Sequence, residues 1–256
     1  MTSICFGYLV QPRAECGVPD VTFTPRIVGG IQATEHSYPW IVAIMREDTV
    51  HCGASLLTDR HLLCAGHCFR WSDHTQMEVI LGLDSLDDLS DVVFRRIKDV
   101  TIHEEFTSTQ VRDDSDVSVV TLDLPIQFGP AMLPICLPSP TDDYTDWTAT
   151  VAGWGRVGTN DPTSSSLQQA NVRVLSRERC FASELSPHLT ENMMCAFAEG
   201  KDGCQVLKVK GSKKTDLFYH LQRNVSLPFL NHAGELSDAR RRGLKYDFPK
   251  PAHSAK

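Results

Sequence analysis

The 256-residue sequence contains no apolar run that approaches the ~20 residues needed for a membrane-spanning helix, so we do not expect an integral membrane protein. Internal repeats and low-complexity tracts are also missing, which argues against a repeat architecture. The chain is long enough for one large all-β domain or two smaller ones. A hydrophobic content of 41% is sufficient for a packed core.

A clear targeting signal is missing as well. The short apolar patch Ile4–Val10 is interrupted by Gly7, follows no charged segment and precedes no clear cleavage site. We interpret it as a poor or truncated secretory signal. The nine cysteines nevertheless suit a disulfide framework, which predicts an oxidising compartment and a secreted or extracellular protein.

Charge is distributed unevenly along the chain, whose net charge is −7. Residues 206–256 hold 11 of the 25 Lys and Arg residues but only 4 of the 32 Asp and Glu residues. The last 51 residues therefore carry a net charge of +7 and the rest of the chain −14. This change of sign predicts a boundary near residue 205.

Short apolar or alternating runs separated by turn-forming residues are typical of a β-sandwich or β-barrel. A proline-rich linker starting at Pro125 divides them into two groups. The expected strands lie within Ile41–Met45, His51–Leu57, Met77–Leu83, Val92–Ile102 and Val117–Ile126 before or at the linker, and Trp147–Trp154, Leu167–Leu175 and Met193–Phe197 after it. A short helix is expected over Ser176–Leu185.

Five motifs occur in a telling order: Arg26-Ile27-Val28-Gly29-Gly30, Leu63-Cys64-Ala65-Gly66-His67-Cys68, Asp116-Val117-Ser118-Val119-Val120, Gly153-Trp154-Gly155 and Lys201-Asp202-Gly203-Cys204-Gln205. Together they resemble the trypsin-like serine proteases of the chymotrypsin fold. The resemblance implies an all-β fold of two packed antiparallel β-barrels, the second one truncated. It divides the chain into a leader and pro-segment (1–26), a C-terminally incomplete protease domain (27–205) and an unrelated basic tail expected to be disordered (206–256).

The resemblance gives three residues a role. His67 matches the general base and Asp116 the buried carboxylate that fixes its tautomer. Asp202 matches the acid at the floor of the primary specificity pocket, which implies a preference for Arg or Lys side chains. Each residue also has a plainer alternative. His67 could be an ordinary histidine beside a structural disulfide, Asp116 a surface acid in the cluster with Asp113 and Asp114, and Asp202 an acid in a loop.

The segment after Gln205 departs from the family. Where the family has glycine, aspartate and the nucleophilic serine, this chain has Val206, Leu207 and Lys208. We therefore predict that the chain as written cleaves no peptides. The tail serines Ser212 and Ser226 lack flanking glycines and are poor substitutes.

The cysteine pairs are also implied by the resemblance: Cys52 with Cys68, Cys180 with Cys195, and Cys16 with Cys136. The last pair would keep the pro-segment attached after cleavage between Arg26 and Ile27. The states of Cys5, Cys64 and Cys204 stay open, although Cys64 is expected to be a small buried group. A zinc site made of His51, Cys52, Cys64, His67 and Cys68 is the weaker alternative, so no metal or other cofactor is expected.

The expected partners are protein or peptide substrates, if the parent enzyme is complete, and an activating protease that cuts at Arg26. No membrane or nucleic-acid partner is expected. Two other interpretations stay open. One is a non-catalytic homologue that acts as a binding or decoy protein through the cleft near Asp202. The other is a polyanion binder that uses the basic run Arg240-Arg241-Arg242. The tail itself could arise from a splice variant, intron read-through or an error in the gene model.

Overall fold

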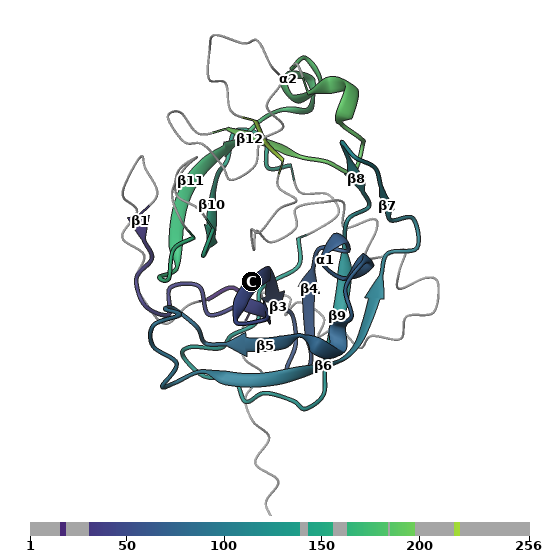
Figure 1. Ribbon diagram of the computed structural model, residues 1–256. Helices are drawn as coiled ribbons and strands as arrows, with labels where there is room; N and C mark the ends of the chain where they lie inside the picture. Colours follow the sequence, from purple (N-terminus) through teal and green to yellow (C-terminus); the bar gives the residue numbers. More distant parts are fainter. Residues whose placement is uncertain are drawn as a thin grey trace, which may run out of the picture.

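A computed structural model describes residues 16–18, 31–138, 143–155, 163–183 and 185–197, together with the backbone of 218–220. Six of its strands form a closed antiparallel barrel in the order β2-β3-β4-β9-β6-β5. These strands are β2 (Ile41–Arg46), β3 (Thr49–Leu56), β4 (His61–Cys64), β5 (Glu78–Leu81), β6 (Val93–Ile102) and β9 (Ser118–Leu122). Figure 1 shows the barrel in the lower half of the molecule. The all-β prediction is confirmed, and five of the six barrel strands lie where the apolar runs predict them.

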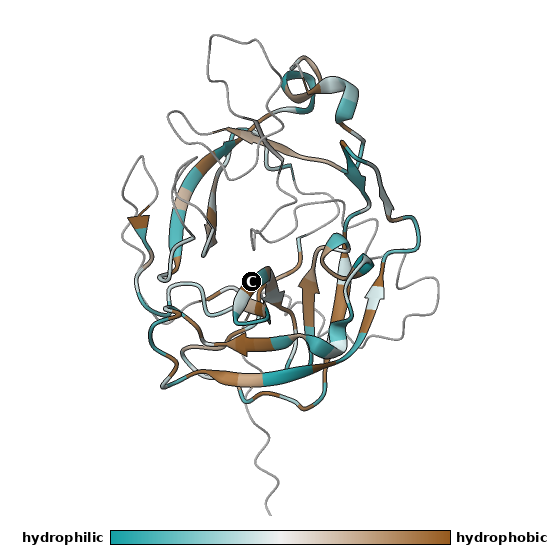
Figure 2. Ribbon diagram, viewed as in Figure 1, coloured by the Kyte–Doolittle hydropathy of each residue, from teal (hydrophilic) through white to brown (hydrophobic). Residues whose placement is uncertain are grey.

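Strand β2 is buried on both faces because it separates two apolar clusters. Side chains alternate across a strand, so Val42 and Ile44 point into the barrel, where they pack with Leu62 and Val120. Ile41 and Ala43 belong to the other cluster, which includes Trp154 and Leu167 from segments next to the second sheet. This arrangement explains why the strand reads as a continuous apolar run, and Figure 2 shows the barrel strands as mainly hydrophobic.

A second sheet contains five strands in the described residues, with order β1-β11-β12-β13 and β10 paired to β11. Its strands are β1 (Ile31–Gln32), β10 (Thr148–Gly153), β11 (Gln168–Val174), β12 (Cys195–Phe197) and β13 (Phe218–His220). All pairs are antiparallel. The backbone of β13 pairs with β12 although it belongs to the predicted tail. The rest of 206–256 lies outside the described residues, so the nature of the tail stays a prediction.

The remaining elements are short. A two-stranded hairpin joins β7 (Thr107–Ser108) to β8 (Asp113–Asp114), and a single helical turn, α1 (His67–Arg70), follows β4. The expected helix after Leu175 is shorter than predicted, since α2 (Arg177–Phe181) is followed by the separate 3₁₀ turn η2 (Ser186–His188). Another 3₁₀ turn is η1 (His74–Gln76). Among the described residues, no helix has the length and apolarity that a membrane crossing requires.

In the part of the chain that the structure describes, three disulfides join the segments of the fold: Cys16–Cys136, Cys52–Cys68 and Cys180–Cys195. These are the pairs that the resemblance implies. The first ties residues 16–18 to the segment before Leu137, where the Gly17 amide also donates to the Pro134 carbonyl at 2.8 Å. Cys64 is a buried free thiol, and Cys5 and Cys204 lie outside the described residues.

Candidate active site

His67 begins α1 at the end of the β4 strand, next to Gly66. A Cβ atom at Gly66 would lie 3.0 Å from Cγ2 of Ile102, 3.3 Å from the Val117 carbonyl oxygen and 3.4 Å from Oδ1 of Asp116. Only glycine therefore lets the segment that carries His67 approach the segment that carries Asp116 without a shift of either.

Asp116 precedes β9 and follows a tight bend in the chain. Ser115 has a φ of 49°, in the left-handed region, and the Val117 amide donates to the Ser115 carbonyl at 2.9 Å. This backbone conformation is uncommon for a residue other than glycine. The Asp116 side chain that follows this bend points inward and is 0% exposed.

His67 and Asp116 make two hydrogen bonds to each other. The backbone N–H of His67 donates to Oδ1 of Asp116 at 2.7 Å, and Nδ1 of His67 lies 2.6 Å from Oδ2. An ionised Asp116 accepts the Nδ1 proton, which leaves the lone pair of Nε2 available to accept a proton. The imidazole is 23% exposed, so a reacting group can reach it from one side.

Two neighbours that sequence reasoning did not select hold this pair in place. The buried Ser118 hydroxyl lies 3.2 and 3.1 Å from the carbonyl oxygens of Cys64 and Ala65, which fixes β9 against the segment leading to His67. On the other side of the bend, Oδ1 of Asp114 accepts hydrogen bonds from Thr190 at 2.7 Å and Asn192 at 3.4 Å. These contacts connect the Asp116 loop to the segment that precedes β12.

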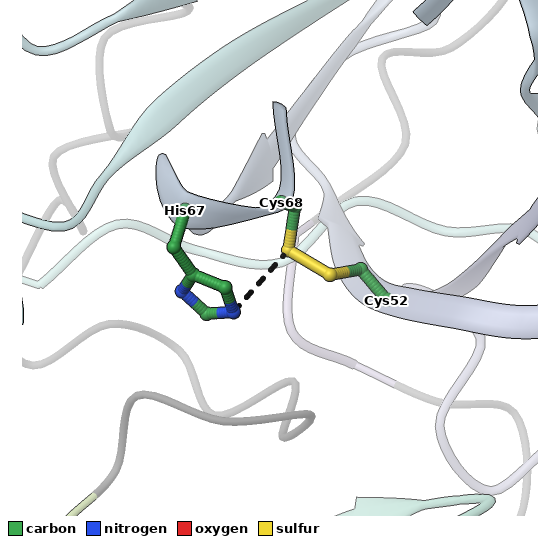
Figure 3. A group of neighbouring side chains, drawn as sticks. All are labelled: Cys52, His67 and Cys68. Atoms are coloured by element: carbon green, nitrogen blue, oxygen red, sulfur yellow. Dashed lines mark hydrogen bonds between the residues drawn. A yellow bond between two sulfur atoms is a disulfide. The ribbon is translucent and has the colours of Figure 1, made fainter. Parts of the chain in front are cut away.

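The Cys52–Cys68 disulfide lies beside the imidazole, and Figure 3 shows Nε2 of His67 directed toward Sγ of Cys68, 3.7 Å away. Disulfide sulfurs offer no thiolate to a metal, so the zinc alternative loses two of its five ligands. A third, Cys64, donates its S–H to the Gly53 carbonyl at 3.3 Å. Burial raises the pKa of this thiol to about 12.

Of the predicted functional residues, the structure brings His67 and Asp116 together. Asp202 and the cleavage site Arg26–Ile27 lie outside the described residues, as does the segment Val206–Lys208. Asp113, which the sequence offered only as a member of an acidic surface cluster, is buried with 7% exposure.

The family model Trypsin matches residues 27–205 of the sequence. The chain belongs to the trypsin family of serine proteases. The match ends at Gln205.

Several serine proteases and related proteins are similar to the chain. Serine protease filzig of Drosophila melanogaster is 32% identical over 210 residues, which are 76% of this chain and 12% of that protein. The identity is 30% for venom serine protease 34 of Apis mellifera and 33% for the proclotting enzyme of Tachypleus tridentatus, with 71% and 74% of this chain matched. The chain spans 46% and 55% of these two proteins.

A solved structure has the same fold. Neuropsin, described as a serine protease expressed in the limbic system of mouse brain, matches with a TM-score of 0.63 and 25% sequence identity. The match covers 70% of this chain and 78% of the neuropsin chain.

Proposed function

We propose that this chain is a trypsin-type protease domain that retains the general base and its orienting acid but has no nucleophile, and is therefore catalytically inactive as written. One observation carries the proposal. The family match ends at Gln205, and the next residues are Val206, Leu207 and Lys208 where the family has glycine, aspartate and serine.

The assembled pair cannot perform peptide hydrolysis alone. His67 can accept a proton at Nε2, but an acyl-enzyme forms only when a hydroxyl placed beside Nε2 attacks the peptide carbonyl. Loss of the serine from a comparable triad lowers the rate by about 10⁶-fold, which corresponds to a barrier higher by about 8 kcal/mol.

The two residues before Lys208 support the same conclusion. Val206 stands where the family has a glycine of the oxyanion hole, and a β-branched residue restricts the backbone conformations that glycine allows. Leu207 stands where an aspartate would receive the new amino terminus at Ile27 after cleavage. A leucine cannot pair with a buried ammonium group, whose isolated burial is costly.

The parent enzyme, with the family's complete end, is proposed to cleave proteins after Arg or Lys. A carboxylate at the position of Asp202 would pair with these cations and leave a neutral side chain unmatched. An activating protease is proposed to cut after Arg26, and the Cys16–Cys136 disulfide would keep the pro-segment attached. Three disulfides support an extracellular location for the protein.

A chimaera tests whether the absent nucleophile is the defect. Residues 206–256 are replaced by the corresponding segment of an active trypsin-family protease, and the chain is cleaved after Arg26. We expect the chimaera to react with a fluorophosphonate probe at the restored serine and to hydrolyse an arginyl amide, whereas His67→Ala in the chimaera abolishes hydrolysis. Fluorophosphonate labelling of the unmodified chain at a serine would contradict the proposal.

A second function, binding without catalysis, is favoured by the strand pairing of the tail. An unpaired sheet edge invites aggregation, and β13 covers the edge of β12 with backbone hydrogen bonds. In this case the cleft near Asp202 would hold an arginine side chain of a partner without cutting it. Fluorescent p-aminobenzamidine, an arginine mimic, would then bind the chain and lose affinity in Asp202→Asn; no binding would exclude this function.

A further inference from the structure

The surface at the end of α1 contains an arginine that lies against two aromatic rings. The guanidinium carbon of Arg70 is 4.6 Å from the centroid of the Trp71 ring and 5.4 Å from the centroid of the Phe106 ring. Arg70 ends α1 and Phe106 directly precedes β7, so the two rings come from separate segments of the chain. Trp71 is 81% exposed, more than any other large hydrophobic side chain in the described residues.

The N–H donors of Arg70 are free to bind a partner. A guanidinium carries five N–H donors in one plane, and stacking on aromatic rings fixes the orientation of that plane. Within the described residues, no hydrogen bond or ion pair uses the Arg70 donors. Asp73, an acid close by in the sequence, instead accepts from the amide and the hydroxyl of Thr75. Arg70 is therefore a prearranged cation that lacks a carboxylate.

A second guanidinium lies on the same surface. Nη1 of Arg46, at the end of β2, lies 3.3 Å from the hydroxyl oxygen of Ser72, the residue after Trp71. Its Nε lies 3.7 Å from a carboxylate oxygen of Glu47, whose side chain is 82% exposed. An ion pair this exposed contributes little, so a carboxylate from another protein can replace Glu47.

We propose that Arg46, Arg70, Trp71 and Phe106 form a binding surface for an acidic segment of a partner protein. A carboxylate of that segment pairs with Arg70, because the planar guanidinium presents two parallel N–H groups that match the two carboxylate oxygens. An apolar side chain next to the carboxylate covers the exposed part of the Trp71 ring. Arginine and tryptophan are the residue types that dominate binding energy at protein interfaces.

This surface lies close to the candidate catalytic pair. His67 and Arg70 are the two ends of α1, which places them about 4.5 Å apart along the helix axis. A partner bound to Arg70 and Trp71 would therefore lie beside the imidazole. Binding does not depend on catalysis, because none of the four residues belongs to the segment after Gln205.

Fluorescence anisotropy tests the proposal on the full disulfide-bonded chain, with a labelled peptide in which glutamates flank a phenylalanine. We expect saturable binding, with affinity reduced by more than about 10-fold in Arg70→Gln and in Trp71→Ala. Two matched controls should leave the affinity unchanged: Arg96→Gln alters an exposed cation on β6, and Trp147→Ala alters an aromatic side chain that is 61% exposed. A peptide with glutamines in place of the glutamates should bind at least about 10-fold more weakly.

The wild-type chain provides a readout that guards against a variant that fails to fold. In a proton–nitrogen correlation spectrum, the acidic peptide should shift the indole N–H signal of Trp71 and leave that of Trp147 in place. The proposal would be overturned by the absence of saturable binding, by equal binding of the glutamine peptide, or by equal losses of affinity in Arg70→Gln and Arg96→Gln. A shift at Trp147 without one at Trp71 would place the peptide elsewhere and refute the assignment.

Discussion

The hydrogen bond between Asp114 and Thr190 should couple the stability of the catalytic loop to the second sheet. Oδ1 of Asp114 accepts from the Thr190 hydroxyl at 2.7 Å and from the Asn192 amide at 3.4 Å, across 76 and 78 residues of sequence. A hydrogen bond to a charged group contributes about 1.5–3 kcal/mol. Both side chains are only half-buried, so solvent reduces this to about 1 kcal/mol for the Thr190 bond.

A double-mutant cycle of Asp114→Ala and Thr190→Val measures the free energy of interaction between these two side chains. We expect Asp114→Ala to lower the free energy of unfolding by about 1.5–2.5 kcal/mol, since it also removes the hydrogen bonds that Asn192 and the Ser115 amide donate to Asp114, and Thr190→Val to lower it by about 1 kcal/mol. The double variant should be no less stable than Asp114→Ala alone, which gives a coupling of about 1 kcal/mol. Urea unfolding with intact disulfides provides the three values.

Hydrogen exchange should report the same loosening at the active site. The His67 amide, which donates to Asp116 at 2.7 Å, should exchange faster in Asp114→Ala. Gln110→Ala changes an exposed residue of the same hairpin and should alter stability by less than about 0.5 kcal/mol. If the effects of Asp114→Ala and Thr190→Val add within about 0.3 kcal/mol, the reasoning is refuted.

Three further predictions follow from burial in the barrel. Leu62→Ala, at a fully buried site, should destabilise the chain by about 2–5 kcal/mol in urea unfolding, whereas Leu124→Ala, 59% exposed, should have an effect below about 0.5 kcal/mol; equal effects would contradict the core assignment. Because the pKa of Cys64 is raised to about 12, its thiolate fraction at pH 8 is about 10³-fold below that of an exposed thiol. Native alkylation, mapped by mass spectrometry, should therefore be slow and rise tenfold per pH unit; rapid labelling at pH 8 would disprove this. Gly66→Ala should lower stability by about 1–3 kcal/mol because of its contacts at 3.0–3.4 Å, and Gly129→Ala, with nothing within 4 Å, should not; matching melting temperatures would count against the close approach.

Much of the fold follows from local patterns in the sequence. Alternating runs such as Val92–Ile102 predict the strand that the structure forms as β6, because hydrophobic period and turn residues are local properties. Strand β4 (His61–Cys64) was not predicted, because it forms through pairing with β3 and β9, which are separate segments of the chain. The pairing of β13 with β12 was equally inaccessible, because nothing in the sequence of Phe218–His220 names its partner.

The candidate site shows the same division. His67 and Asp116 could be selected because each lies in a motif that resembles the family's. The burial of Asp113 and the hydrogen bonds that hold Asp114 could not be predicted, since a run of acidic residues predicts a solvated surface loop. Their placement depends on the left-handed Ser115 and on Thr190 and Asn192, which are distant in sequence.

The rate of arginyl amide hydrolysis by this polypeptide, purified free of other proteases and cleaved after Arg26, tests the central claim most directly. With no hydroxyl for His67 to activate, we expect turnover about 10⁶-fold below that of an active family member, with no change in His67→Ala. Hydrolysis at a rate typical of the family, lost in His67→Ala, would contradict the account.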